Sequence, residues 1–432
     1  LYAMYDGGYR PTASFSKSSR VVGEVMGNYH PHGDAAIYDA LARLVQWLSL
    51  RHPLVAGQGN FGTPGNLGPA APRYTECKMA PLAMEMVRDI DEDSVDFQDN
   101  YDGRNQEPVI LPSRFPNLLV NGSEGIAVGM ATRIPPHNLR EVIAGTRHLI
   151  AHPEASLEDL MAIVPGPDLP AGGMIVGLDG IREAYRTGRG KFLTRATARI
   201  ENITPRKKGI VVTELPHLVG PEKVIARIKE TVASKKLQGI TDVADLTDRK
   251  NGTRLVITVK NGYNPEAVLA QLFRHTPLED SFGINNVCLV DGQPRTLGLR
   301  ELLEVFVRHR LTVVERRTRF RLGRRRERQH LVEGLLIAIL DIDDVIAIIR
   351  SSDDAESARE RLMTAFDLSE AQANYILELR LRRLTKFSRI ELETERDELM
   401  ATIASLREIL ENPKLLRKLV KKELREVSKR LG

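Results

Sequence analysis

Only two cysteines, Cys77 and Cys288, occur among the 432 residues of the sequence. So few cysteines exclude a disulfide-stabilised scaffold and any zinc site built from four cysteines. They lead us to expect a reducing, cytoplasmic environment. Long apolar runs are missing as well, because the longest one, at residues 335–340, ends at Asp341. A membrane-spanning helix needs roughly 18 apolar residues, so we expect no membrane insertion.

A leader segment and a strong charge of one sign are also missing. The chain starts at Leu1 without an initiator methionine or a charged-then-apolar leader. We therefore expect a fragment that begins inside a domain rather than a secreted protein. The 62 Lys and Arg residues exceed the 57 Asp and Glu residues by only five. This excess permits a nucleic-acid partner but does not by itself indicate one.

The residues that are present predict a multidomain α+β protein. With 42% hydrophobic and 28% charged residues the chain is globular, and at roughly 100–200 residues per domain it has several domains. Residues 1–116 are rich in Gly, Pro, Asn, His and Tyr, and a helical spacing over residues 35–48 follows Asp34 as N-cap. Residues 117–296 have the mixed pattern of an α/β domain. We expect strands there at 173–176, 209–213 and 255–259, and a helix at 222–235.

The remaining residues predict a long antiparallel coiled coil. Residues 299–340 contain no proline, which favours a single helix of about 40 residues. A 4-3-4 spacing, typical of a coiled-coil seam, joins Val307, Leu311, Val314 and Thr318, and recurs in Leu399, Ile403, Leu406 and Leu410. We expect two arms, 297–340 and 387–432, on either side of a helical tip at 341–386. An apolar set in the tip is large enough for homodimerisation: Ile376, Leu377, Leu379, Leu381 and Leu384.

Two histidines and an aspartate, His30, His32 and Asp34, stand at the start of the helical segment expected over 35–48. Imidazole and carboxylate groups ligate metals, so this spacing is compatible with a metal site. The same groups at a helix N-terminus can instead contact a phosphate. A capped turn with solvated histidines is the third interpretation, and spacing alone leaves all three open.

An arginine and a tyrosine are adjacent at Arg73 and Tyr74, after a Gly-, Pro- and Asn-rich loop at residues 56–69. A phenol can act as a nucleophile, and a guanidinium can hold two phosphate oxygens and stabilise added charge. The pair therefore fits phosphoryl transfer, although an isolated Arg-Tyr pair is more often structural.

Two further segments have competing interpretations. Ile126 lies in a glycine-rich loop that has neither Walker nor Rossmann spacing. The default for such an isoleucine is a core position, and the alternative is a wedge between base pairs. The arginine-rich run at 316–328 is by default a solvated coiled-coil surface rather than a specific DNA contact.

Several long motifs in a fixed order closely resemble the A subunit of the bacterial type IIA topoisomerases, DNA gyrase and topoisomerase IV. The resemblance covers essentially the whole chain. It rests on GNYHPHGD (27–34), GQGNFG (57–62), APRYTE (71–76), EPVILPSRFPNLL (107–119), GIAVGMA (125–131) and HTPLEDSFG (275–283).

The resemblance implies a fold and an activity. It implies a winged-helix domain at 1–116, a tower domain at 117–296, and a coiled coil that ends in a dimer gate. The implied enzyme cleaves and religates both strands of a DNA duplex, so that a second duplex can pass. It works as an A2B2 heterotetramer, in which the partner B subunit hydrolyses ATP and supplies most ligands of Mg²⁺.

The resemblance also implies the roles of four residues in catalysis. Tyr74 matches the nucleophile, which forms a transient 5′-phosphotyrosine link, and Arg73 matches the arginine that assists it. His30 matches a histidine near the scissile phosphate. His32 lies in the same motif, and we include it among the candidate catalytic residues.

Three further residues are candidates for DNA binding. Ile126 matches the isoleucine that inserts between base pairs and helps to bend the DNA. Lys17 and Arg20, at the start of a short helical segment, are our candidates for phosphate contacts.

The chain departs from the family pattern at two positions. Pro72 stands where gyrases usually have methionine, which argues against gyrase in particular. Ala35 stands where many relatives have serine, in the helix where fluoroquinolones bind, whereas the acidic Asp39 is retained. We therefore expect weaker fluoroquinolone action. We also expect that a basic residue before Leu1 and a C-terminal DNA-wrapping domain lie outside this fragment.

Two other functions remain as alternatives to the topoisomerase. One is a dimeric scaffold that bends DNA without cutting it, which should tolerate the substitution Tyr74→Phe. The other is a metal-dependent hydrolase built on His30, His32 and Asp34, which should carry bound metal and form no covalent DNA adduct.

Overall fold

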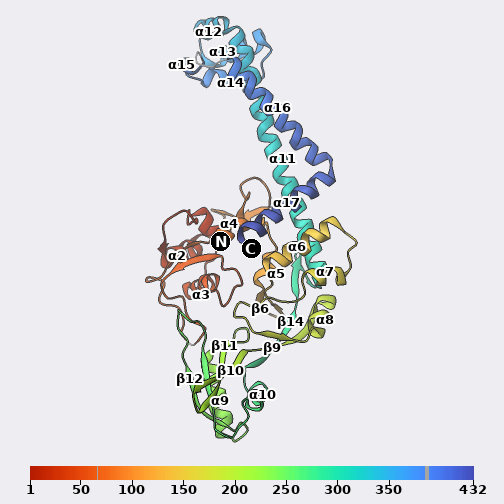
Figure 1. Cartoon of the computed structure of the whole chain (residues 1–432). Coiled ribbons are helices and arrows are strands. Elements are labelled where there is room, and N and C mark those ends of the chain that lie inside the picture. Colours follow the sequence, from red (N-terminus) through yellow and green to blue (C-terminus); the bar gives the residue numbers. More distant parts are fainter. Residues whose placement is uncertain (66, 385–388) are drawn as a thin grey trace. The chain divides into compact units, whose positions relative to one another are not determined.

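A computed structural model describes residues 1–65, 67–384 and 389–432. These residues form two compact units (Figure 1). Unit 1 comprises Leu1–Arg88, Val95–Arg310 and Lys421–Gly432, and unit 2 comprises Asp89–Ser94 and Leu311–Val420. Among the described residues, no helix combines the length and the hydrophobicity that crossing a bilayer requires.

The N-terminal part of unit 1 consists of short helices and a small antiparallel sheet of strand order β1-β3-β2. The helices are α1 (Tyr2–Asp6), α2 (Ser18–Asn28), α3 (Asp34–Val45) and α4 (Pro81–Val87), and the strands are β1 (Ser16–Lys17), β2 (Val55–Gln58) and β3 (Glu76–Met79). A separate hairpin follows, formed by β4 (Phe97–Asp99) and β5 (Gln106–Pro108). Helices beside a three-stranded antiparallel sheet are what a winged-helix domain requires, and the domain type itself stays a prediction.

Helix α3 corresponds to the helical segment expected over residues 35–48, with corrections at both ends, because it ends at Val45 and its start is shifted as well. Gly33 occupies the N-cap, whereas Asp34 is the first helical residue. The Asp34 carboxylate accepts a hydrogen bond from the Ala35 N–H at 3.0 Å. A negative charge in the first turn also stabilises the positive end of the helix dipole. The N-cap assignment of Asp34 is therefore wrong by one residue.

A five-stranded sheet follows in unit 1, with the strand order β6-β7-β14-β9-β8 (Figure 1). Its strands are β6 (Ser123–Ala127), β7 (Met130–Ile134), β8 (Met174–Val176), β9 (Arg189–Arg195) and β14 (Glu279–Asn285). Four helices of unit 1 flank these strands in the sequence: α5 (Asn117–Asn121), α6 (Leu139–Ala151), α7 (Leu157–Ile163) and α8 (Asp179–Thr187).

A four-stranded sheet of order β10-β11-β13-β12 and two helices form a second layered region of unit 1. Its elements are β10 (Thr197–Thr204), β11 (Lys207–Glu214), β12 (Ile240–Asp245), β13 (Leu255–Val259), α9 (Pro221–Ala233) and α10 (Pro265–His275). Alternate residues of the central strands, such as Ile210 and Val212, share one core with Val224 and Leu272 of the helices. The hairpin of β15 (Val287–Val290) and β16 (Gln293–Thr296) completes the strands of this unit.

Every strand pairing among the described residues is antiparallel. Strands and helices do alternate as expected, but the α/β pattern predicted for residues 117–296 does not produce a parallel sheet. A short connection imposes this direction on β10 and β11, because parallel neighbours need a crossover of a dozen residues or more. Only residues 205–206 separate β10 from β11. Residues 117–296 are therefore better described as an α+β region than as an α/β domain.

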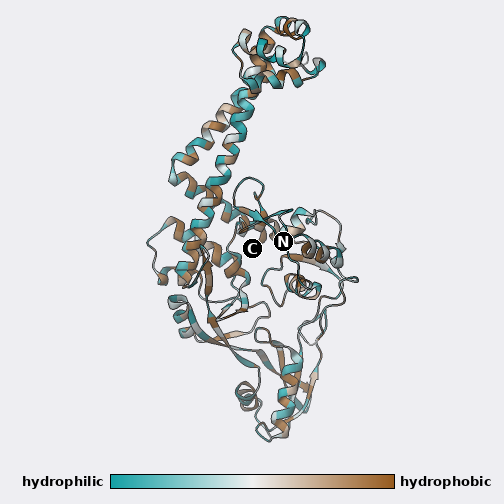
Figure 2. Cartoon of the chain, turned by 180° about the vertical axis from the view of Figure 1, so that it is seen from behind, coloured by the Kyte–Doolittle hydropathy of each residue, from teal (hydrophilic) through white to brown (hydrophobic). Residues whose placement is uncertain are grey.

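Unit 2 contains most of the predicted coiled coil. Helix α11 (Leu299–Leu340) enters unit 2 at Leu311, and α16 (Arg389–Glu411) runs back alongside it (Figure 1). Hydrophobic and hydrophilic residues alternate along both helices (Figure 2). Arg328 Nε lies 2.7 Å from Glu395 Oε1 and joins the two helices. The predicted seam is confirmed where Val314, Thr318, Leu399 and Ile403 are buried.

The second arm is not one continuous helix, although we expected a single arm over 387–432. Helix α16 ends at Glu411, and α17 (Pro413–Leu431) begins after Asn412. A proline is well tolerated in the first turn of a helix but cannot donate the hydrogen bond that an uninterrupted helix needs. Pro413 therefore starts a new helix instead of continuing α16.

The tip of unit 2 has a core of its own. It consists of α12 (Ile342–Ser351), α13 (Ala355–Phe366), α14 (Glu370–Glu378) and α15 (Leu381–Leu384). Ile376 is buried in this core, and Leu377 and Leu379 pack against it. The proposal that Ile376 belongs to a dimerisation surface is therefore wrong, because its side chain is already used inside the tip. The side chains of Leu381 and Leu384, and the arm boundary at 386–387, lie outside the described residues.

Candidate functional site

The adjacent residues Arg73 and Tyr74 lie in a turn just before β3, and both side chains are exposed. The Arg73 Nη2 donates a hydrogen bond to the Tyr74 hydroxyl at 3.2 Å, and its guanidinium lies 4.6 Å from the centre of the Tyr74 ring. Tyr74 is 63% exposed. The geometry therefore presents a phenol oxygen to solvent with a cation beside it, as an attack on a phosphate requires.

The backbone of this turn is attached to the start of α2. The Ser19 N–H donates to the Pro72 carbonyl at 3.0 Å, and the Ser18 N–H donates to the Thr75 carbonyl at 2.9 Å. These two bonds lie on either side of Arg73 and Tyr74. The exposed pair is thus carried on a backbone that is fixed at both ends.

Lys17 and Arg20, the candidates for phosphate contacts, are brought to the same region. Lys17 pairs with Glu76 across β1 and β3, two residues after Tyr74. Its Nζ lies 3.4 Å from a Glu76 carboxylate oxygen, and both side chains are partly exposed. Such a surface ion pair contributes little stability, so a phosphate can compete for Lys17. Arg20 is exposed in the first turn of α2.

The two candidate histidines, His30 and His32, lie in the exposed turn between α2 and α3. Their rings stack on one another with centroids 4.0 Å apart. Among the described residues, no hydrogen bond or ring contact joins either histidine to Arg73 or Tyr74. No group of three or more His, Cys, Asp or Glu side chains in that part of the chain is placed to hold a metal ion.

Two other tyrosines near α2 differ from Tyr74 in their surroundings. The Tyr9 hydroxyl donates to Glu24, and burial together with that carboxylate raises the pKa of Tyr9 to about 12. Burial and the Asp6 carboxylate raise the pKa of Tyr29 above its ordinary value. Both hydroxyls are therefore already engaged as hydrogen-bond donors to carboxylates, and loss of their protons is made harder than for an ordinary tyrosine.

Ile126 lies at the end of the β6-β7 hairpin and is 93% exposed. It pairs with Ala131 across the hairpin, and the equally exposed Val128 precedes Gly129 in the turn. Gly129 has a φ of +79°, a left-handed conformation that glycine adopts without strain. The default assignment of Ile126 to a core is therefore wrong. An exposed isoleucine on a narrow hairpin is available for contact with a ligand.

The expected drug-contact residues Ala35 and Asp39 both lie on α3 and are exposed. They are four residues apart and therefore share one face of the helix. The buried face of the same helix carries Tyr38, whose hydroxyl reaches the turn of Tyr74. Tyr38 and Thr75 are residues that pattern analysis missed, because a tyrosine on a helix has no signal that reveals a hydrogen bond to a distant loop.

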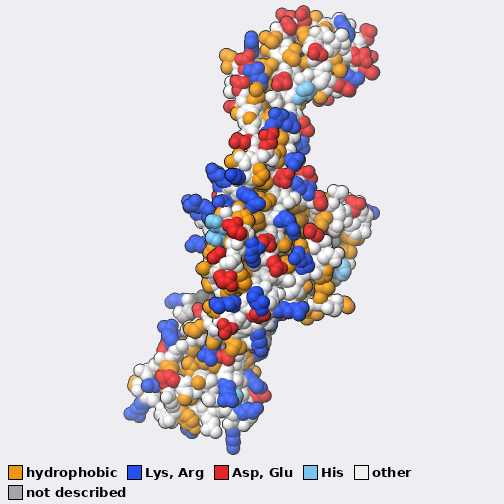
Figure 3. Space-filling model, turned by 90° about the vertical axis from the view of Figure 1, so that its right-hand side faces the viewer, with side chains coloured by type: hydrophobic (Ala, Val, Ile, Leu, Met, Phe, Trp, Pro, Cys, Tyr) orange, Lys and Arg blue, Asp and Glu red, His pale blue; other side chains and the backbone are white. Residues whose placement is uncertain are grey.

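The arginine-rich run of α11 is largely exposed, as expected for a solvated coiled-coil surface, but its first part forms ion pairs with a distant segment. Arg317 Nη1 lies 2.8 Å from an Asp89 carboxylate oxygen, and Arg321 contacts both Asp89 and Glu92. Arg316 pairs with Asp93. Figure 3 shows Lys and Arg side chains interspersed with Asp and Glu along the coiled coil. The segment Asp89–Ser94, far away in sequence, therefore pairs with three arginines of this run.

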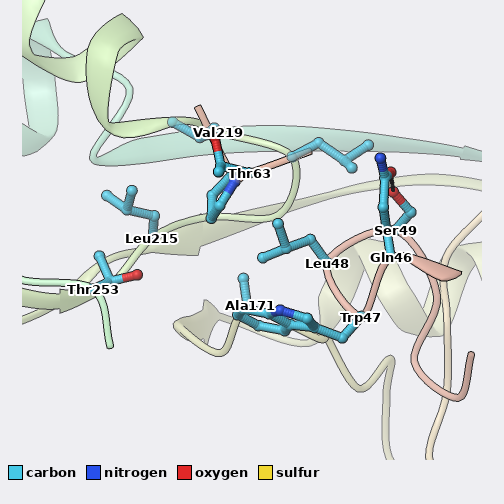
Figure 4. A pocket seen from close by; sticks show the side chains of 11 residues that line it. Gln46, Trp47, Leu48, Ser49, Thr63, Ala171, Leu215, Val219 and Thr253 are labelled. Atoms are coloured by element: carbon cyan, nitrogen blue, oxygen red, sulfur yellow. Dashed lines mark hydrogen bonds between the residues drawn. The ribbon is translucent and has the colours of Figure 1, made fainter. Parts of the chain in front are cut away.

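A pocket lies elsewhere in unit 1 (Figure 4). Its lining comes from five parts of the chain and includes Trp47, Leu48, Ala171, Leu215 and Val219. None of the candidate catalytic or DNA-binding residues lines it.

Comparisons with known proteins agree with the motifs. A family model that describes the A subunit of DNA gyrase/topoisomerase IV matches residues 1–425. The DNA gyrase A subunit of Streptomyces coelicolor is 54% identical over 436 residues, which cover 100% of this chain and 51% of that protein. The protein of the same name from Nocardioides sp. is 53% identical, over 95% of this chain and 45% of its own length. That from Staphylococcus epidermidis is 48% identical, over 100% and 48%.

The chain spans about half the length of these relatives. All three relatives are named DNA gyrase, although Pro72 departs from the methionine that gyrases usually have at this position. The family match includes the turn of Arg73 and Tyr74, the histidine turn and the Ile126 hairpin. Since it extends over nearly the whole sequence, the chain belongs to the A-subunit family of DNA gyrase and topoisomerase IV.

Proposed function

We propose that this chain is the DNA breakage-and-reunion core of a type II DNA topoisomerase, an isomerase, with Tyr74 as nucleophile. One observation carries the proposal. In a chain of this family, an exposed phenol and an arginine lie within hydrogen-bonding distance on a turn that is fixed at both ends.

The chemistry is a reversible transesterification. The Tyr74 oxygen attacks a backbone phosphorus, an O–P bond forms, and the bond from phosphorus to the 3′ oxygen breaks. The phenol proton leaves the tyrosine and the 3′ oxygen of the broken strand gains one, so that the reverse step restores both groups. Arg73 stabilises the extra negative charge on the phosphoryl oxygens in the transition state. Because the phosphodiester energy stays in the phosphotyrosine, resealing needs no ATP.

The other candidates have supporting roles in this proposal. His30 and His32 lie on an exposed turn from which they can contact the scissile region, and Lys17 and Arg20 contact flanking phosphates. Ile126 enters between base pairs of the cleaved duplex. Ala35 and Asp39 form the drug-contact face of α3, and the loss of the serine hydroxyl at position 35 weakens fluoroquinolone action.

We propose that Mg²⁺ is ligated mainly by the partner B subunit, which also binds and hydrolyses ATP. The complete enzyme is an A2B2 assembly in the cytoplasm, on chromosomal DNA. Residues 1–116 act in it as a winged helix, residues 117–296 as a tower, and the coiled coil as the support of a dimer gate.

A covalent-capture experiment tests the proposal. The complete A subunit is mixed with its B subunit, Mg²⁺ or Ca²⁺ and a duplex labelled at its 3′ or 5′ ends, and is then denatured with detergent. We expect the 3′ label to stay on the protein, because the attached fragment begins with the 5′ phosphate, and the 5′ label to be released.

The substitution Tyr74→Phe should abolish this retained label. Tyr263→Phe is a matched control, since Tyr263 is another exposed tyrosine, far from Tyr74 in sequence. A wild-type adduct that survives in Tyr74→Phe would contradict the assignment of the nucleophile. If DNA is bound and bent but no adduct forms with an active B subunit, the non-cleaving scaffold is the better description.

A further inference from the structure

A buried cluster of hydroxyl groups lies directly beneath the turn of Tyr74. The Tyr38 hydroxyl donates a hydrogen bond to the Ala70 carbonyl at 2.5 Å and lies 2.9 Å from Thr75 Oγ1. Thr75 Oγ1 in turn lies 2.8 Å from Ser18 Oγ. Thr75 and Ser18 are fully buried, and Tyr38 is 6% exposed. The three hydroxyls therefore form a chain of contacts within hydrogen-bonding distance, which ends on a backbone carbonyl and has almost no access to bulk water.

The two ends of this cluster enclose the reactive pair. Ala70 comes three residues before Arg73, and Thr75 comes directly after Tyr74. The Tyr38 hydroxyl contacts Ala70 and Thr75. The Ser18 and Ser19 N–H groups donate to the Thr75 and Pro72 carbonyls. These four contacts hold the segment from 70 to 75. The exposed side chains of Arg73 and Tyr74 have no comparable hold of their own, so their position depends on this backbone.

The Tyr38 hydroxyl has no evident purpose in packing. A phenylalanine would fill the same space without the cost of burying a polar group. What the hydroxyl adds is a link from α3 to both ends of the nucleophile turn. We infer that Tyr38 and Thr75 are positioning residues, which hold the turn so that Tyr74 is aligned for attack. This inference rests on the proposed function.

The same link joins two surfaces of α3. Ala35 and Asp39 occupy its exposed face, and Tyr38 occupies its buried face. A ligand that shifts α3 from the exposed side displaces the Tyr38 hydroxyl and with it the turn of Tyr74. Helix α3 thus links a contact on its exposed face to the position of Tyr74.

Positioning has a kinetic signature that differs from loss of folding. Alignment of the nucleophile favours the transition state shared by cleavage and religation. Its loss should slow both directions by a similar factor, and the fraction of cleaved DNA at equilibrium should change little. A partly unfolded variant behaves in the opposite way, because fewer molecules react while the folded ones keep the normal rate.

The test combines the complete A subunit with its B subunit. It measures how fast the covalent complex approaches equilibrium in a single turnover. Tyr38→Phe removes one hydroxyl, and Thr75→Val removes the other with little change of shape. We expect each to slow the approach roughly 10-fold, because small misplacements of reacting groups have large effects on rate. DNA affinity should be unchanged, since neither side chain is exposed. Thr75→Ser keeps the hydroxyl and should retain most of the rate.

The double variant Tyr38→Phe/Thr75→Val gives an independent check. If both groups act through one hydrogen-bonded link, it should be little slower than either single variant. Wild-type rates in Tyr38→Phe and Thr75→Val overturn the inference, as does a loss of amplitude at normal rate. Tyr74→Phe separates this result from the proposed function, because an adduct that persists in Tyr74→Phe refutes the nucleophile itself.

Discussion

At the scale of single residues, Ile126 is an apolar side chain in an exposed position. Its side chain is 93% exposed, next to an exposed valine on the same hairpin. An isolated exposed hydrophobic residue is ordinary on a protein surface. Two of them on the narrow tip of one hairpin fit the wedge function that we proposed for Ile126.

Replacing Ile126 should therefore affect DNA more than folding. We expect Ile126→Ala to change the free energy of unfolding by less than about 0.5 kcal/mol, because the side chain is exposed. DNA bending, measured by energy transfer between dyes at the ends of a duplex, should fall clearly. Affinity should weaken roughly 10-fold, which corresponds to about 1.4 kcal/mol.

Leu289→Ala is the control for this prediction, since Leu289 is 71% exposed on β15. It should leave both bending and affinity unchanged. Equal losses in the two variants would show that Ile126 has no specific contact with DNA.

The residues of the candidate site were predictable to different degrees. Arg73 and Tyr74 are neighbours in the chain, so their pairing is visible in the sequence itself. Tyr38 and Thr75 are 37 residues apart, and only the packing of α3 beneath the turn brings their hydroxyls together. Ile126 could not be assigned from local pattern, because an apolar residue between glycines has the same appearance in a core and on a hairpin tip.

At the scale of secondary-structure elements, the segment Asp89–Ser94 stabilises α11 through ion pairs of unequal burial. The Arg317 and Asp89 side chains are 4% and 12% exposed, whereas those of Arg316 and Asp93 are 28% and 72% exposed. A charge that loses its partner inside a protein is far more costly than one that loses it in solvent. The two pairs should therefore contribute very differently.

We expect Asp89→Asn to lower the free energy of unfolding by about 3 kcal/mol and Asp93→Asn by less than about 1 kcal/mol. Urea titration followed by circular dichroism measures both. The two variants remove the same charge from the same segment, so they differ mainly in burial. Equal effects would show that burial of the Arg317–Asp89 pair does not matter.

The effect of Asp89→Asn should also depend on pH. Burial alone would raise the pKa of the Asp89 carboxyl, but the hydrogen bond and the charge of Arg317 lower it below its ordinary value. A carboxyl with a lowered pKa stabilises the fold above the pKa of the unfolded chain, which is about 3.9. The difference from wild type should therefore be constant between pH 7 and pH 5 and should shrink as the pH falls below about 4.

Elements with uninterrupted patterns were predicted best. The expected helix over 299–340 and the expected strand over 255–259 have the same bounds as α11 and β13. The second arm was predicted less well, because heptad spacing continues to Leu410 while Pro413 ends the helical hydrogen bonding just beyond it. The partners of the arginine run could not be predicted, since Asp89 and Arg317 are 228 residues apart.

At the scale of the whole molecule, we expect the chain to form a homodimer. Leu377 and Leu379 are only partly buried within the tip and remain candidates for a shared surface. Sedimentation equilibrium at micromolar concentration should give about 97 kDa, twice the 48.3 kDa of one chain. A mass of one chain over a range of concentrations would contradict dimerisation of this fragment.

Helix α11 belongs to both units, and this has a mechanical consequence. Arg310, which is almost fully buried, donates hydrogen bonds to the Pro112 carbonyl and to Glu423 and holds the helix at that point. Beyond it, residues 311–340 extend about 45 Å at a rise of roughly 1.5 Å per residue. The helix is therefore fixed within unit 1 by a buried arginine, while its remaining 30 residues belong to unit 2, which has a hydrophobic core of its own.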